Sequence, residues 1–136
     1  MAQSYSFKTP PGVTIDGEIV QFLESFYRIS DTPGDHDNYV DQFEEDATFI
    51  VAGKRNRGRD EIMKQRISMW DLVKERKHTV YQIFPYGNDA TDFMLIGLVN
   101  YQLKTGGSKD VEWAGRAQLA KSSSGKWQMR FYQIWL

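Results

Sequence analysis

Histidine is the residue type in this chain best suited to acid–base chemistry, and the 136 residues include only two of them. His78 stands at the predicted start of a strand, just after a basic segment. An imidazole titrates near neutral pH without help, so His78 could move a proton between carbon and oxygen atoms of a substrate. It could equally cap the preceding helix or bond the backbone. His36 lies among acidic residues on a turn that opens a helix, and we expect it to be solvated.

A predicted β-hairpin carries a second group of polar residues. Its turn is marked by Gly106-Gly107, because glycine accepts the positive φ angles of a tight turn. If these are the two loop residues, Tyr101 lies opposite Glu112, and Val99 and Arg116 have side chains on the same face. We expect this face to line a pocket in which the Tyr101 and Arg116 side chains hold a carbonyl or enolate oxygen.

The two faces of the hairpin have different predicted roles. Arg130 and Tyr132, from the last strand, are expected on the pocket face, where Arg116 could instead form a buried salt bridge with Glu112. The opposite face is nearly dry and would leave a large apolar patch on a monomer, which predicts a homodimer contact. An error of one residue in register would exchange the two faces. The predicted dry face carries Trp113, Leu119, Trp127, Met129 and Phe131.

The remaining elements must cover this hairpin, because its first strand is apolar on both faces. Apolar residues recur at three- and four-residue steps after Asp16, which predicts a helix with one buried stripe. We therefore expect an α+β fold, with N-terminal helices packed in a strongly curved antiparallel sheet. Residues 1–13 are a predicted tail and 14–136 a single domain. We expect three helices, one over residues 16–30, one that begins near residue 35, and one that begins at residue 60 and carries Trp70. A basic loop over 54–59 precedes the third helix. Strands are expected over 47–52, 78–84, 93–103, 111–120 and 127–136.

Composition excludes several classes of function. The net charge is −1, so no global field attracts nucleic acid or an anionic membrane. The chain has no cysteine, which excludes disulfides and thiolate chemistry. We find no signal peptide or membrane-spanning run, and expect a cytoplasmic protein. No phosphate-binding glycine loop, dinucleotide fingerprint or histidine–carboxylate cluster is present, which predicts chemistry without a cofactor or metal.

The order of elements and one segment resemble a known family. The segment is 31–49, Asp-Thr-Pro-Gly-Asp-His-Asp-Asn-Tyr-Val-Asp-Gln-Phe-Glu-Glu-Asp-Ala-Thr-Phe, followed by Gly53 and by Gly58-Arg-Asp-Glu-Ile62. It is similar to the SnoaL-like branch of the nuclear-transport-factor-2-like (cone) superfamily, over about residues 16–136. The resemblance implies a cone with an apolar pocket and a sheet face that commonly pairs two subunits. The superfamily includes polyketide cyclases, scytalone dehydratase, ketosteroid isomerase and non-catalytic association modules, so fold leaves function open.

The resemblance also suggests roles for individual residues. His78 is placed like a pocket histidine of scytalone dehydratase. Asp31 is placed like that enzyme's pocket aspartate, and could orient or charge-balance a histidine, although aspartate before Thr-Pro-Gly is often only a turn residue. Tyr27 lies near the position of the oxyanion-stabilising tyrosine of ketosteroid isomerase, although a tyrosine on an apolar stripe is usually core.

Two departures prevent either known mechanism from transferring intact. Val51 occupies the position of the isomerase's general-base aspartate, and Tyr101 and Arg116 stand near the positions of the dehydratase's second histidine and its asparagine. The sequence predicts a cofactor-independent isomerase, cyclase or dehydratase for an apolar, oxygenated metabolite such as a polyketide or terpenoid. The alternative is a non-catalytic binding or association module. The predicted catalytic residues are His78, Tyr101, Arg116 and Asp31, and the predicted substrate-binding residues are Tyr27, Trp70, Val99, Glu112 and Tyr132.

Overall fold

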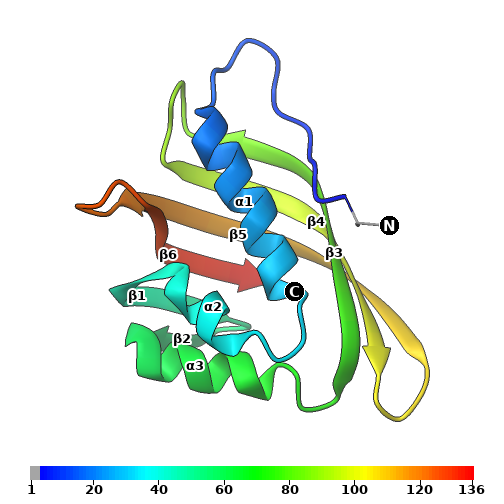
Figure 1. Cartoon of the computed structure of the whole chain (residues 1–136). Helices are drawn as coiled ribbons and strands as arrows, with labels where there is room; N and C mark the ends of the chain where they lie inside the picture. The colour runs from blue at the N-terminus through cyan, green and yellow to red at the C-terminus, as the bar shows by residue number, and fades with distance from the viewer. Residues whose placement is uncertain (1–3) are drawn as a thin grey trace.

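The computed structural model describes residues 4–136, and its helices lie in the hollow of a curled six-stranded sheet (Figure 1). The strand order is β2-β1-β6-β5-β4-β3, and every neighbouring pair is antiparallel except the parallel pair β1–β6. The α+β prediction is confirmed. In chain order the elements are α1 (Gly17–Ser30), α2 (His36–Asp41), β1 (Phe43–Val51), β2 (Lys54–Arg57), α3 (Gly58–Ser68), β3 (Val73–Pro85), β4 (Asp92–Leu103), β5 (Ser108–Lys121) and β6 (Trp127–Trp135).

Helix α1 forms as its sequence pattern predicts and lies across the concave side of the sheet (Figure 1). The Asp16 side chain caps it by accepting a hydrogen bond from the Glu18 amide at 2.8 Å. Its apolar stripe faces the sheet, where Leu23 and Phe26 are fully buried. No helix among the described residues is long and apolar enough to cross a membrane.

The segment predicted as a basic loop is instead the edge strand β2. The chain reverses at Ala52 and Gly53, which have φ angles of 48° and 82°, and Lys54–Arg57 then pairs antiparallel with the end of β1. Main-chain pairing next to a tight turn therefore outweighs the low strand propensity of charged residues. Helix α3 follows directly and ends at Ser68, so Trp70 lies in the connection to β3.

The β4–β5 hairpin forms, but the expected register is wrong. Gly106 and Gly107 do have positive φ angles, of 92° and 90°, yet the turn is longer than these two residues, because the Leu103 amide donates to the Gly107 carbonyl. The observed pairs include Tyr101 with Lys109 and Gly97 with Trp113. The shift is an odd number of residues, so it exchanges the faces of β5.

The face exchange corrects several sequence-based expectations. Trp113, Leu119 and Met129, expected outside, are buried against the helices. Trp127 is half-buried and packs against the same core. The register of β6 shifts at its pairing with Gln118 and Leu119, which allows Tyr132 to be buried as well.

The segment before α1, residues 4–13, runs beside the free edge of β3 (Figure 1). Lys8 forms a parallel bridge with Gln82, through its amide to the Tyr81 carbonyl and its carbonyl to the Ile83 amide. This contact covers part of an edge strand. It also buries Tyr5.

Candidate active site

A buried aspartate–histidine pair lies where the end of α1 meets β3. Asp31 is the C-cap of α1, and its amide donates to the Tyr27 carbonyl. Its Oδ1 lies 2.6 Å from Nδ1 of His78, and its Oδ2 accepts the His78 amide at 2.7 Å. Two contacts to one carboxylate hold the imidazole in one orientation. The structure thus brings together two residues that are 47 positions apart in the sequence.

The pairing determines which ring nitrogen of His78 is basic. An ionised carboxylate only accepts hydrogen bonds, so Nδ1 carries the proton and Nε2 keeps its lone pair. Nε2 has no hydrogen-bond partner among residues 4–136. Burial lowers the pKa of His78 below its ordinary value, against the opposing effect of Asp31. The ring is therefore neutral near pH 7 and can accept a proton at Nε2.

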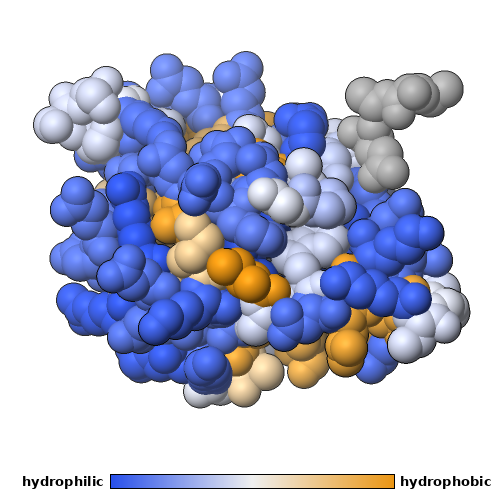
Figure 2. Space-filling model, turned by 60° about the horizontal axis from the view of Figure 1, so that its bottom comes forward, coloured by the Kyte–Doolittle hydropathy of each residue, from blue (hydrophilic) through white to orange (hydrophobic). Residues whose placement is uncertain are grey.

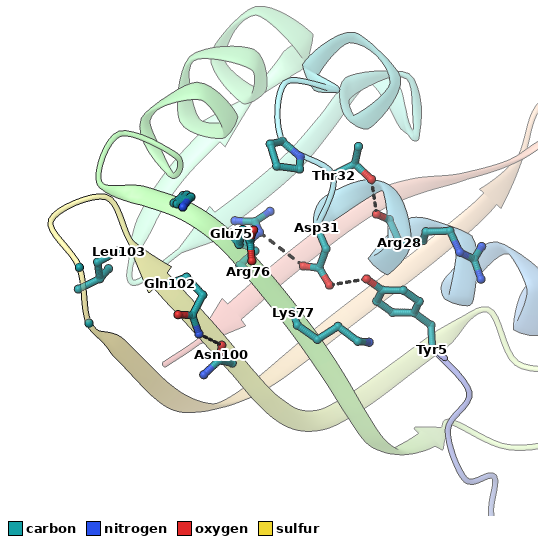
Figure 3. A pocket seen from close by; sticks show the side chains of 14 residues that line it. Tyr5, Arg28, Asp31, Thr32, Glu75, Arg76, Lys77, Asn100, Gln102 and Leu103 are labelled. Atoms are coloured by element: carbon teal, nitrogen blue, oxygen red, sulfur yellow. Dashed lines mark hydrogen bonds and ion pairs between the residues drawn. The ribbon is translucent and has the colours of Figure 1, made fainter. Parts of the chain in front are cut away.

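Neighbouring groups keep Asp31 ionised. Burial alone would raise the pKa of Asp31, but the hydrogen bonds from His78 and the charge of Arg76 lower it below the ordinary value. The Arg76 Nε lies 3.6 Å from Oδ1, and the Tyr5 hydroxyl donates to Oδ2 at 2.9 Å. Figure 3 shows the carboxylate between these two side chains.

His78 lines a cavity of about 630 Å³ that is mostly apolar. The cavity lies between the α3–β3 connection, the β4–β5 hairpin and the end of β6. Figure 2 turns this end of the molecule toward the viewer, where hydrophobic side chains reach the surface between hydrophilic ones. The polar lining side chains are Ser68, Asp71, Arg76, His78, Tyr101, Lys109 and Trp113, and the apolar ones are Val51, Met69, Leu72, Val73, Leu103, Ile134 and Leu136.

Arg76 is the buried cation of this site. Its Nε and Nη2 donate to the Ser30 carbonyl, Nη2 also donates to the Ser30 hydroxyl, and the guanidinium lies 4.7 Å from the centre of the Trp70 ring. Arg76 also borders a second, more polar groove of about 830 Å³ on the other side of Asp31, drawn in Figure 3. Asp31 lines that groove and His78 lines the apolar cavity, so the pair lies between the two.

Several predicted site residues lie around this pair without lining the apolar cavity. The Tyr27 and Tyr132 hydroxyls are 2.8 Å apart in the core, and the Tyr27 ring centre is 5.2 Å from that of His78. Val99 is the cross-strand partner of His78. Trp70 is buried beneath Arg76. Tyr101, in contrast, lines the cavity with His78 as expected.

Arg116 and Glu112 do not reach the cavity, which corrects their predicted placement. Both lie on the outer face of β5 because of the hairpin register. Arg116 pairs there with Asp92 at 3.0 Å, and 43% of its side chain is exposed. Glu112 is exposed on the same face. The expected buried Glu112–Arg116 salt bridge is therefore absent.

Sequence reasoning missed Arg76, Trp113 and Tyr5. Arg76 could have been found, because residues two apart in a strand share a face and Arg76 precedes His78 by two. Trp113 was expected on the outer face because the predicted hairpin register is wrong. Tyr5 had no signal in the sequence, since its contact with Asp31 depends on the path of the N-terminal segment. Within residues 4–136, no three histidine, cysteine, aspartate or glutamate side chains are grouped as a metal site requires.

Comparison with known proteins identifies the fold. No protein-family model and no curated protein sequence matches the chain. Solved structures do match. A candidate scytalone dehydratase from Novosphingobium aromaticivorans has a TM-score of 0.75 at 14% identity, over 86% of this chain and 80% of that one. ActVI-ORFA from Streptomyces coelicolor has a TM-score of 0.72 at 14% sequence identity, and the match covers 87% of this chain and 93% of that one. Nuclear transport factor 2 from Cryptosporidium parvum has a TM-score of 0.70 at 11% sequence identity, and the match covers 84% of this chain and 87% of that one.

Proposed function

Since this chain has the nuclear-transport-factor-2-like cone fold, we propose that it is a cofactor-independent isomerase, cyclase or dehydratase acting on an apolar, oxygenated metabolite such as a polyketide or terpenoid. His78 is the general base and acid, and Asp31 orients it. One observation carries this proposal. The imidazole lines an apolar cavity with Nε2 unbonded while a buried carboxylate holds Nδ1.

The chemistry follows from that arrangement. Nε2 removes a proton from a carbon next to a substrate carbonyl, and the electron pair moves to the carbonyl oxygen as an enolate. The Tyr101 hydroxyl, on the same cavity wall, stabilises that oxygen. The protonated His78 then returns its proton to another carbon, which isomerises the substrate, or to a departing hydroxyl, which releases water. The Asp31 carboxylate stabilises the imidazolium in between.

Two observations favour an enzyme over an association module. The cavity is open rather than filled by aromatic side chains, and it brings a titratable group together with a hydroxyl donor. Among the structural neighbours, one is described as a candidate scytalone dehydratase and another as having a ketosteroid isomerase-like fold. Those names apply to those proteins. They support the proposal because such reactions need only acid–base groups in an apolar cone.

The test is proton exchange on β-tetralone, an apolar bicyclic ketone, followed by NMR in deuterated water. The wild-type protein should accelerate exchange of the hydrogens next to the carbonyl. His78→Gln should lose about a hundredfold or more of that acceleration, the usual scale for a general base. Arg116→Gln, on the outer face, is the matched control and should exchange like wild type. Equal rates for wild type and His78→Gln would contradict the proposal.

We also propose a homodimer formed through the outer face of the sheet. Large apolar side chains are exposed there, namely Tyr81, Phe84, Met94 and Trp135 at 44%, 46%, 38% and 45%. Phe131 lies half-buried on the same face. A second subunit would remove this apolar surface from water.

A further inference from the structure

Arg76 is a buried cation, and the carboxylate that faces it already accepts hydrogen bonds from other residues. Its side chain is 1% exposed, and its ion-pair partner among residues 4–136 is Asp31, at 3.6 Å. Both oxygens of that carboxylate accept hydrogen bonds from other residues, namely His78 and Tyr5. A buried charge is costly unless it is paired and hydrogen-bonded. Asp31 therefore balances Arg76 only in part.

A second arginine makes the local imbalance larger. Arg66 is fully buried, and its hydrogen bonds go to three carbonyl oxygens at the end of α1 and to Nδ1 of His36, but to no carboxylate within residues 4–136. Asp31 is the one buried acidic residue within residues 4–136. Burial and the charge of Arg76 lower the pKa of Arg66 to about 10, so it stays charged at neutral pH. With His78 neutral, the buried cluster carries one excess positive charge.

Hydrogen-bond donors without partners also line the apolar cavity. Nη1 of Arg76 and the Tyr101 hydroxyl form no hydrogen bond with the described residues. The Trp113 indole nitrogen is buried, lines the same cavity and is likewise unsatisfied. Of these donors only the Trp113 nitrogen is fully buried, and buried donors in native proteins nearly always have partners. A ligand with acceptor oxygens that enters the cavity would offer partners to the free donors of Arg76 and Tyr101.

We propose that the cavity binds substrates with an apolar body and an anionic carboxylate, and that Arg76 is the residue that selects the carboxylate. The carboxylate supplies the negative charge that the buried cluster lacks, and a guanidinium recognises it through charge-assisted hydrogen bonds. The apolar lining accepts the body. Lys109 and Asp71 also line the cavity, but both are exposed and their opposite charges offset each other. This inference names the substrate class of the proposed active site, and so rests on the cavity used there.

Calorimetric titration with β-naphthoate and its neutral methyl ester tests the inference without any turnover. The two probes share one bicyclic body and differ in charge. Wild type should bind the naphthoate at least about tenfold more tightly than the ester, the scale of one charge-assisted hydrogen bond. An ester that binds as well as the naphthoate, or a naphthoate with no detectable binding at millimolar concentration, would overturn the inference.

Variants then assign the preference to a residue. Arg76→Gln should abolish it, whereas Lys109→Gln, which removes the exposed lining cation, should retain it. Loss in Lys109→Gln with retention in Arg76→Gln would overturn the role of Arg76. Because Arg76 also binds the end of α1, circular dichroism should verify its fold, and the wild-type comparison stands even where that variant unfolds. His78→Gln should keep the preference, so failure of this inference is distinguishable from failure of the proposed catalysis.

Discussion

His78 depends on a single neighbour for its chemical role. Without Asp31 the imidazole could present either nitrogen to the cavity, and burial alone would leave both tautomers available. The 2.6 Å contact with the carboxylate places the proton on Nδ1 and leaves the base at Nε2. Arg76 and Tyr5 in turn hold that carboxylate in its charged form.

The protonation of His78 predicts how activity depends on pH. Its pKa is lowered from 6.5, so the neutral base predominates at neutral pH and exchange of β-tetralone should fall only on acidification below that value. Asp31→Asn removes the charge that raises the pKa of His78, so the acidic limb should move to still lower pH and the maximal rate should fall. The rate–pH profiles of the two proteins provide the measurement. An acidic limb that begins above pH 6.5 in wild type would contradict the assignment.

The stability of the folded protein should also decrease as the pH falls. Below about pH 6.5 His78 is protonated in the unfolded chain, whereas its lowered pKa keeps it neutral in the folded chain until the pH is lower. Folding therefore becomes less favourable as the pH falls through that value. Asp31 adds a further loss of stability when the pH falls toward 3.8 and below, because its pKa is lowered in the folded state. Urea unfolding between neutral pH and about pH 5 should show a smaller decline for His78→Gln than for wild type. Parallel declines would show that His78 is not buried in its neutral form.

The hairpin β4–β5 illustrates what register does at the level of an element. The expected inward Arg116 would have made Arg116→Ala costly, since it would leave a buried Glu112 unpaired. In the observed register Arg116 is partly exposed and pairs with Asp92, so Arg116→Ala should cost less than about 1 kcal/mol of unfolding free energy. Denaturant titration measures this. A loss of about 3 kcal/mol or more would favour the shorter turn and the opposite faces.

Helix α1 offers a matched pair of phenylalanines. Phe26 is fully buried and contacts Tyr132 and Phe43, so Phe26→Ala should cost about 3 to 5 kcal/mol through lost burial and a cavity. Phe22 is half-buried, one turn earlier, and Phe22→Ala should cost clearly less. Thermal and urea unfolding of both variants tests the rotation of the helix. Equal losses would mean that α1 presents a different face to the sheet.

The exposed apolar side chains on the outer face of the sheet predict that two copies of the chain associate. Trp135→Glu places a charge in the proposed contact and should shift the sedimentation coefficient of a dimer to that of a monomer. Ile67→Glu is the control, because Ile67 is similarly exposed, at 46%, but lies on α3. It should leave the dimer unchanged. Sedimentation of wild type as a monomer at micromolar concentration would contradict the dimer.

Most helices and strands and their order could be predicted from the sequence, because local patterns carry that information, and the edge strand β2 was the exception. The cap at Asp16, the apolar stripe of α1 and the positive φ angles at Gly106 and Gly107 depend on residues within a few positions of each other. These patterns also marked His78 as the best candidate for proton transfer. The curled sheet followed from the strand pattern together with the resemblance to the cone superfamily.

Which side chains share the cavity depends on long-range packing, and the sequence pattern did not predict it. The turn length set the hairpin register, and an odd shift moved Trp113 inward and Arg116 outward although their alternation along β5 was unchanged. The contacts of Asp31 with His78 and Tyr5 join residues 47 and 26 positions apart, so no local pattern could specify them. The charge state of the site depends on the same long-range packing, because burial beside Arg66 and Arg76 exists only once α1, α3 and β3 meet.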